Sequence, residues 1–354
     1  MQEKSRHGIL AGGNWIIDRV KVIDVYPSQE RLANILSESL SHGGAPFNVL
    51  KALNRMAFDF PLEGIGVIGD DENGQEILRQ CNQRNIGCAQ ITVLKGTSTS
   101  YTDVMTTASS GIRTFFHYRG ANALLDETYF DFGNTRAKIF HLGYLLLLDG
   151  LDAVDSDGTT GAARVLKKAR ESGLITSADV VSEQSDRYKR IIPPSLKFAD
   201  ILFINDFETR MLTGLDVVDE KGDFRSGDGY AAAKAILEMG VHQWVIIHFP
   251  KGVLAAGSNG DRIFQETLRI PTSAIKGTVG AGDAFAAGVL GGVHEGLHIR
   301  DCLVMGVCAA AASLMDETAS EGIKPWKECL SLVGRFGFNG GSTASQSNAI
   351  QLST

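Results

Sequence analysis

Short apolar runs alternate along this chain with segments of helical character. The runs with strand character are Gly8–Leu10, Gly64–Ile68, Lys138–Leu142, Ile201–Ile204 and Trp244–Ile247. The later runs are followed by glycine or polar residues and then by helix-like segments such as Ala231–Met239. Strands that alternate with helices are typical of βαβ units around a buried parallel sheet, so the pattern predicts an α/β fold.

Two stretches depart from this alternation. Trp15–Ser28 and Ile91–Tyr118 alternate apolar with polar residues, which predicts strands that bury only one face. We expect them to form a small sheet beside the main body, supplied from about residues 15–28 and 91–119. The last residues, 339–354, are rich in Gly, Ser and Asn and carry little apolar surface. We therefore expect one domain over residues 1–338 and a disordered tail after it.

Composition narrows the class of protein. The chain has 354 residues, of which 44% are hydrophobic, and this is enough for a large core. Its formal net charge of −7 argues against nucleic acid as the main partner. Five cysteines without a CxxC pair suit a reducing compartment, so we expect a cytoplasmic protein. We expect neither a signal peptide nor a membrane partner, because no apolar run approaches the roughly 20 residues that cross a bilayer.

The segment Lys276–Leu290, KGTVGAGDAFAAGVL, carries the strongest chemical signal. It is a glycine-rich turn that leads into a helix-like run, and such a turn lets backbone N–H groups converge on an anion at a helix N-terminus. Asp283 lies at the start of this helix, where it could accept the proton of an attacking hydroxyl. Asp283 could equally be a helix cap beside a tight turn, and composition alone leaves both interpretations open.

Other phosphate-binding motifs do not fit. The chain contains no GxxxxGK[ST] sequence of the Walker type. Gly64, Gly66 and Gly69 form a GxGxxG pattern, but no ribose-binding acid follows them in a clear βαβ unit, so we discount dinucleotide binding. Phosphoryl transfer remains the best match, because it requires in-line positioning, an anion cradle and a base rather than covalent chemistry.

Residues Gly277–Gly288 resemble the GAGD anion-hole signature of the ribokinase-like, or PfkB, family of carbohydrate kinases. Three other segments resemble that family's motifs in the same order: GGNWIID, SHGGAPFN and NDFE. The wording GGAP and the Tyr-Arg pair in FFHYRGANALL are similar to the fructokinase and keto-deoxygluconate kinase branch. The resemblance extends to about Leu332. It implies a ribokinase-like three-layer α/β/α sandwich with a mostly parallel central sheet and a small β lid.

The resemblance also implies how a phosphoryl group would move from ATP to a sugar-like substrate. Asp283 would be the catalytic base, and the backbone of Gly280, Ala281 and Gly282 would form the anion hole. Substrate hydroxyls would be bound by Asn14, Asp18, Gly43, Gly44 and Asn48. Arg119 would favour a substrate that bears a carboxylate or phosphate, through a bidentate pair. Turn or cap roles for Asp18 and Asn48, and an ordinary ion pair for Arg119, are the alternatives.

The nucleotide side follows from the same resemblance. ATP would be contacted by Asn205, Lys251, Gly252 and Thr278. Asn205 and Glu208 would hold Mg²⁺, mainly through its water shell. The two residues also have the spacing of a helix capping box, and both roles are compatible. In several family members the lids of two subunits pair, which implies a homodimer for this chain.

Two positions depart from the family pattern. Gly277 stands where the family usually has an Asp that helps to hold a monovalent cation, which puts potassium activation in question. Phe249 stands where a glycine is expected near ATP, and we favour a core position for its ring. A sugar-binding or regulatory relative without catalysis is therefore the alternative function, although the retained Asp283, Asn205 and Glu208 argue for a kinase. His294, four residues before His298 and without a third ligand, is assigned to a helix surface.

Overall fold

The computed structural model describes residues 6–316 and 320–340. The disordered tail was predicted for residues 339–354, and residues 341–354 of it lie outside the described residues. In the described ranges, each helix is too short or too polar to span a lipid bilayer.

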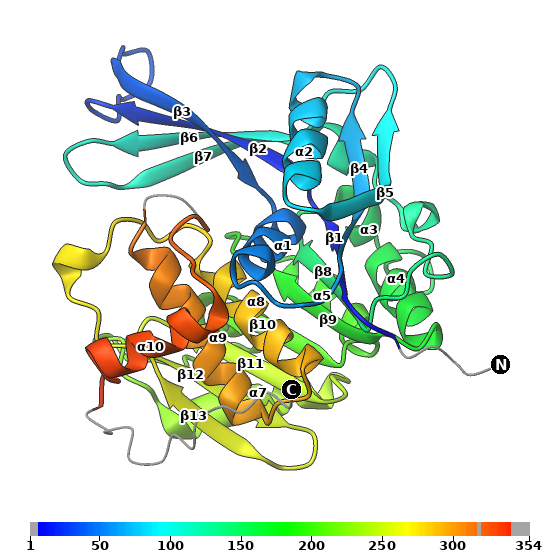
Figure 1. Ribbon diagram of the computed structural model, residues 1–354, viewed down its shortest axis with the longest axis vertical. Coiled ribbons are helices and arrows are strands. Elements are labelled where there is room, and N and C mark those ends of the chain that lie inside the picture. Colours follow the sequence, from blue (N-terminus) through cyan, green and yellow to red (C-terminus); the bar gives the residue numbers. More distant parts are fainter. Residues whose placement is uncertain (1–5, 317–319, 341–354) are drawn as a thin grey trace.

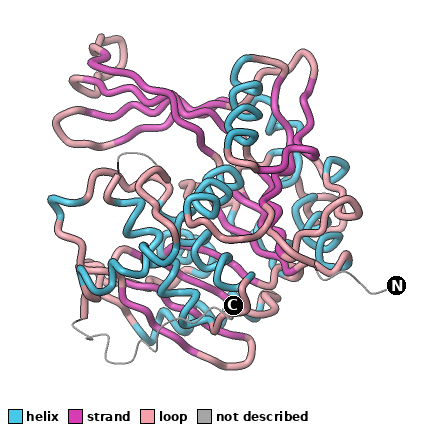
Figure 2. Tube along the Cα trace, viewed as in Figure 1, coloured by secondary structure: helices cyan, strands magenta, loops and turns pink. Residues whose placement is uncertain are grey.

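Within the described residues, nine strands form one large sheet (Figures 1 and 2). In spatial order they are β13 (Arg262–Glu266), β12 (Gly252–Gly257), β11 (Trp244–Phe249), β10 (Ile201–Asn205), β9 (Ile175–Val180), β8 (Ile139–Leu145), β1 (Ile9–Gly13), β4 (Leu62–Gly69) and β5 (Ile86–Leu94). The strands from β11 to β5 pair in parallel, while β12 and β13 form antiparallel hairpins at one edge. The predicted α/β class with a mostly parallel sheet is confirmed.

Helices cover both faces of this sheet, because successive strand residues point to opposite sides. One face packs against α1 (Ala45–Arg55), α2 (Glu72–Gln83), α8 (Ala281–His294), α9 (Ile299–Leu314) and α10 (Trp326–Phe336). The other face packs against α3 (Asp149–Asp152), α4 (Gly161–Glu171), α5 (Tyr188–Leu196), α6 (Asp206–Thr213) and α7 (Ser226–Glu238). On β10, for example, Phe203 joins the first core and Leu202 the second. The result is a three-layer sandwich.

A second sheet of four strands stands off from this body in the described part of the chain (Figure 1). Its order is β3 (Ile35–Gly43), β2 (Ile16–Ile23), β6 (Tyr101–Thr107) and β7 (Arg113–Tyr118). We call these four strands the lid. The predicted boundaries need a correction: β3 was missed, and residues 91–94 belong to β5 of the main sheet. β3 was missed because it is exposed along most of its length and so has no apolar alternation.

His294 also differs from its prediction. We expected it on a helix surface, but it is 5% exposed at the end of α8. Its Nε2 accepts a hydrogen bond from the backbone N–H of Gly8 at 2.8 Å, and its ring lies 3.9 Å from that of Phe60 between centroids. The histidine therefore ties the end of α8 to the start of β1.

Candidate active site

A cavity of about 480 Å³ lies where the lid meets the carboxyl ends of β8, β9 and β10. Ligands of open α/β sheets bind at this edge, because the loops that follow the strands converge there. The lid contributes Ile16, Asp18, Thr102, Phe115 and His117 to the lining. Helices α1 and α8 contribute Asn48, Gly282, Asp283 and Ala286.

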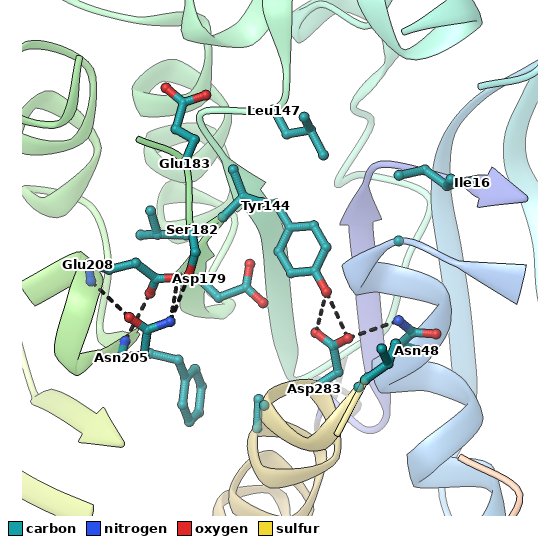
Figure 3. Close-up of a pocket in the computed structure, with 18 of the residues that line it drawn as sticks. Ile16, Asn48, Tyr144, Leu147, Asp179, Ser182, Glu183, Asn205, Glu208 and Asp283 are labelled. Atoms are coloured by element: carbon teal, nitrogen blue, oxygen red, sulfur yellow. Dashed lines mark hydrogen bonds between the residues drawn. The ribbon is translucent and has the colours of Figure 1, made fainter. Parts of the chain in front are cut away.

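Asp283 is fixed at one side of this cavity. It is the third residue of α8 and is 5% exposed. The Tyr144 hydroxyl lies 2.9 Å from Oδ1 and 2.8 Å from Oδ2 of Asp283, so its single proton is shared between the two oxygens. The side-chain amide of Asn48 donates to Oδ2 at 2.9 Å (Figure 3). Residues from β8 and α1 therefore hold the carboxylate in one orientation.

The surroundings of Asp283 change its acidity. Burial raises the pKa of Asp283 to about 7, and the negative charge of Asp179 adds to this effect, while the two hydrogen bonds oppose it. Burial raises the pKa of Tyr144 well above its usual range, so the phenol remains a donor at neutral pH. A base is most effective when its pKa is near the working pH. Asp283 is thus suited to accept a proton from a hydroxyl.

The N-terminus of α8 opens into the same cavity. Gly280 caps the helix with a φ of +75°, a left-handed conformation that favours glycine, and no side chain caps the helix here. The first N–H groups of a helix have no partner within the helix, so they are available to an anion. Gly280 and Gly282 line the cavity. Burial lowers the pKa of the adjacent His248 to about 4, which leaves that ring neutral.

Across the cavity, Asn205 and Glu208 form the capping box expected from their spacing. Asn205 is the N-cap of α6: its Oδ1 accepts from the Glu208 N–H at 2.8 Å, and Glu208 Oε2 accepts from the Asn205 N–H at 2.9 Å. The Ser182 hydroxyl donates to Glu208 Oε1 at 2.6 Å and accepts from the Asn205 amide at 2.8 Å. Glu208 is 4% exposed, and burial raises its pKa to about 8. A cation would stabilise its charged form.

Asp179 is a third carboxylate of the cavity, and Figure 3 places it between the Asp283 and Glu208 groups. Its Oδ2 lies 3.4 Å from Nε2 of the buried His141, whose Nδ1 lies 2.9 Å from the Ser177 hydroxyl. Its Oδ1 is buried without a hydrogen-bond partner. Burial raises the pKa of Asp179. No group of three or more His, Cys, Asp or Glu side chains in the described ranges has the arrangement of a protein-only metal site.

Asp18 lies on the lid side. It pairs with Ser41 on β3 and with Thr102 on β6, and a Cβ atom added to the nearby Gly43 would collide with its carboxylate. Glycine is therefore needed at position 43 because the Asp18 side chain approaches the backbone there. Burial raises the pKa of Asp18 to about 6, and the positive charge of Lys51 opposes this rise.

Some residues predicted for the site lie outside the lining of the cavity. They are Asn14, Gly43, Arg119, Lys251, Gly252, Thr278 and Ala281. Asn14 is fully buried, and it donates to the carbonyl of Leu147 at 2.8 Å and accepts from the Tyr144 N–H at 3.2 Å. It thus holds the segment that carries Tyr144.

Arg119 and Lys251 are both paired with other groups. Arg119 Nη1 lies 3.1 Å from Asp149 Oδ1. This is the ion pair that we gave as the alternative role of Arg119. The amine of Lys251 donates to Asp223 at 2.7 Å and to the carbonyl of Lys221 at 2.7 Å.

Phe249 lies in the core, as expected. It is 5% exposed, and its ring stacks on Phe224 and Phe264 with centroids 5.6 and 6.2 Å away. The aromatic cluster fills the space beside the β11–β12 hairpin, so the Phe249 ring serves packing.

Sequence reasoning missed Tyr144, Asp179, Ser182 and His117, which all line the cavity. The first three lie at or just after the carboxyl ends of apolar strands. Polar residues at the carboxyl ends of parallel strands often belong to a ligand site, and this pattern could have indicated Asp179 and Ser182. His117 lies on an exposed strand among aromatic residues. Its position on the inner face of the lid depends on the register of the lid strands.

Residues 14–326 match the sequence profile of the pfkB family of carbohydrate kinases. The chain is 27% identical over 223 residues to a probable fructokinase-4 of Arabidopsis thaliana, covering 60% of this chain and 64% of the relative. It thus spans less than two thirds of that relative's length. It is 24% identical over 294 residues to a 5-dehydro-2-deoxygluconokinase of Clostridium perfringens, covering 79% of this chain and 80% of the relative.

Solved structures show the same fold. The chain is similar to a ribokinase of Thermotoga maritima with a TM-score of 0.75 and 20% identity, covering 93% of this chain and 99% of that one. It is similar to an Arabidopsis thaliana ribokinase complexed with ribose and ATP with a TM-score of 0.74 and 19% identity, covering 93% of this chain and 99% of that one. The expected ribokinase-like fold is confirmed.

Proposed function

The chain belongs to the pfkB family of carbohydrate kinases, and from this we propose that it transfers the γ-phosphoryl group of ATP to a hydroxyl of a small sugar-like molecule. The observation that carries the proposal is the position of Asp283, whose buried carboxylate meets the uncapped N-terminus of α8 at the cavity. A base and an anion cradle at one point are what phosphoryl transfer requires.

In the proposed reaction, Asp283 accepts the proton of the attacking hydroxyl as the new O–P bond forms and the bond from the γ-phosphorus to its leaving oxygen breaks. Tyr144 and Asn48 hold the two Asp283 oxygens in place. The N–H groups of Gly280, Ala281 and Gly282 stabilise charge on the transferring group. The lid above the cavity excludes water that would otherwise accept the phosphoryl group.

The residues opposite Asp283 fit a divalent cation. Glu208 is a buried carboxylate, and the buried Oδ1 atom of Asp179 has no partner. Together with Asn205 these groups would hold Mg²⁺ largely through its own water shell. When bound, Mg²⁺ neutralises charge on the phosphates of ATP. The retained carboxylates favour an active kinase over a relative that only binds sugar.

The test is ADP release with Mg-ATP across ketoses, aldoses, polyols, sugar acids and nucleosides, with and without potassium because of Gly277. We expect turnover with one substrate class and a loss of about 10²- to 10⁴-fold in kcat for Asp283→Asn, with sugar and ATP binding retained. Asp301→Asn is the matched control, because Asp301 is the third residue of α9 as Asp283 is of α8. Full activity of Asp283→Asn would refute the assignment of the base. Thermal shifts with sugars but not with ATP, and no ADP release, would instead favour the non-catalytic alternative.

We also propose that two copies of the chain pair through their lids. The edge strands β3 and β7 expose large apolar side chains: Ile35, Leu36, Leu40, Phe116 and Tyr118 are 46–59% exposed. Exposed edge strands with apolar side chains favour pairing with another chain. Light scattering after gel filtration should give a dimer, and Leu36→Glu with Leu40→Glu should give a monomer. A wild-type monomer at all concentrations would exclude this pairing.

A further inference from the structure

Lys51 is a buried cation that the proposed reaction does not use. It lies on α1, is 5% exposed, and is absent from the lining of the cavity. Its amine donates to the carbonyl of His42 at 3.1 Å and lies 5.1 Å from the centroid of the Phe47 ring. Within the described residues, no carboxylate forms a direct ion pair with it. A buried ammonium group without an ion pair destabilises a fold, so stability does not account for this residue.

The hydrogen bond of Lys51 reaches a peptide that shapes the surroundings of Asp18. The carbonyl of His42 belongs to the peptide bond between His42 and Gly43, at the end of β3. A Cβ atom added to Gly43 would collide with the Asp18 carboxylate, so the backbone at this position lies directly against that carboxylate. Lys51 therefore holds the backbone that borders Asp18.

Helix α1 links the same lysine to the other side of the cavity. Asn48 lies three residues before Lys51, so the two side chains lie on one face of the helix. Asn48 lines the cavity and donates to Asp283 at 2.9 Å. The segment from His42 to Lys51 thus carries groups that border both Asp18 and Asp283.

Titratable groups face Lys51 from each element that surrounds it. They are Asp18 on β2, His42 on β3, Cys81 on α2, Arg84 just after α2, Asp283 on α8, and Glu321. Burial lowers the pKa of Lys51 to about 8, and the charge of Arg84 adds to this effect, while the three carboxylates oppose it. The amine therefore remains mostly protonated at pH 7.

Asp18 has fewer titratable neighbours. They are Lys51, Tyr144 on β8 and, beyond Thr102 in the strand register, His117 on β7. Burial lowers the pKa of His117 to about 4 and raises that of Tyr144, so both are neutral at pH 7. Of these three neighbours, Lys51 is the one that brings a positive charge to Asp18.

We propose that Lys51 is a positioning residue for Asp18: its hydrogen bond fixes the backbone against the Asp18 carboxylate, and its charge keeps that carboxylate ionised to accept substrate hydroxyls. This inference rests on the proposed kinase function, in which Asp18 binds the substrate, and it adds a residue that acts from behind the cavity.

The pH dependence follows from the sign of the charge. Burial raises the pKa of Asp18 to about 6, and Lys51 opposes this rise. Loss of the lysine charge should move the pKa of Asp18 to a higher value, so the ionised form is lost at a higher pH. At pH 8.5 Asp18 is ionised with or without Lys51. The charge of Lys51 therefore matters most at low pH.

The first experiment follows the ionisation of Asp18 without sugar or nucleotide, so it does not depend on kinase activity. Carbon-13 NMR of labelled aspartate carboxyl groups gives the titration midpoint, and Asp18→Asn assigns the signal. In Lys51→Met the midpoint should rise from about 6 to about 7. Lys51→Arg retains the charge and should keep the wild-type midpoint, as should the control Lys167→Met on the exposed side of α4. An unchanged midpoint in Lys51→Met overturns the inference.

The second experiment measures the Kd of the sugar by calorimetry at several pH values, with the compound of the ADP-release panel that has the highest kcat/KM. A rise of the Asp18 pKa from about 6 to about 7 lowers its ionised fraction at pH 6 from about one half to about 10%. The Kd of Lys51→Met relative to wild type should therefore be about 5-fold higher at pH 6 than at pH 8.5. The kcat at pH 8.5 should stay near wild type, because Tyr144 and Asn48 still hold Asp283.

Stability distinguishes this role from a structural one. Removal of a buried cation without an ion pair should leave the melting temperature of Lys51→Met unchanged or raise it. A lowered melting temperature, with a loss of affinity that is equal at every pH, would assign Lys51 to the fold and overturn the inference. If no compound of the panel is phosphorylated, the kinase function fails, while the Asp18 midpoint still decides the role of Lys51.

Discussion

Replacement of Tyr144 by Phe isolates one hydrogen bond to the proposed base. The Tyr144 hydroxyl donates one proton to the two Asp283 oxygens and so stabilises the ionised carboxylate. A hydrogen bond to a charged group contributes about 1.5–3 kcal/mol, and one pKa unit corresponds to about 1.4 kcal/mol. Its loss should therefore raise the pKa of Asp283 from about 7 to about 8–9.

The direction of the pH effect follows from the role of the base. Asp283 must be ionised to accept a proton, so a raised pKa lowers activity at pH 7 and moves the acidic limb of kcat/KM to higher pH. With a shift of about one to two units, the ionised fraction at pH 7 falls from about one half to roughly 10% or 1%, a loss of about 5- to 50-fold. Activity should recover near pH 9.

The assay is the pH profile of kcat/KM, which reports the free enzyme, for wild type and Tyr144→Phe. Unfolding midpoints across the same pH range serve as the control for stability. A purely structural role of Tyr144 would lower activity equally at every pH. An acidic limb that stays in place, with or without a general loss of rate, would refute the argument that this hydroxyl tunes Asp283.

Two further predictions concern the cation and the core. Glu208→Gln removes a buried carboxyl group whose charged form a cation would stabilise, so half-maximal activity should require about 10- to 100-fold more Mg²⁺ in a titration. Glu238→Gln at the end of α7 should not change this requirement. An unchanged Mg²⁺ requirement in Glu208→Gln would contradict the placement of the cation. Phe249→Ala leaves a cavity in the aromatic cluster of the core and should lower the free energy of unfolding, measured in urea, by about 3–5 kcal/mol. The control is Phe116→Ala on the exposed face of the lid, which should lower it by about 0.5 kcal/mol or less. Unchanged stability with a raised KM for ATP would assign the Phe249 ring to the nucleotide pocket instead.

The main sheet could be predicted because its signal is local. A strand buried on both faces is a continuous apolar run, and β10 and β11 appear as such runs in the sequence. The limits of the lid were harder to predict, because β3 exposes six of its nine residues and its pairing with β2 is a long-range property. The alternation of apolar and polar residues also led us to place residues 91–94 in the lid. They belong to β5, an edge strand of the main sheet with one exposed face, so their pattern resembles that of a lid strand.

The candidate site divides in the same way. Asp283 and the Asn205–Glu208 pair lie within short motifs whose residues also make local contacts, so their positions could be inferred from wording and spacing. The ion pair of Arg119 could not be assigned to a partner from the sequence, because that partner, Asp149, follows a different strand. No short-range pattern relates the two residues.

The chemistry of the base depends on contacts that are distant in sequence. Asp283 receives its hydrogen bonds from Tyr144, 139 residues away, and from Asn48, 235 residues away. The charge that raises its pKa comes from Asp179, on a strand that no motif includes. A motif can therefore point to Asp283 as the proposed base, but only the packing of β8, β9, α1 and α8 around one cavity decides the pH at which this carboxylate would act.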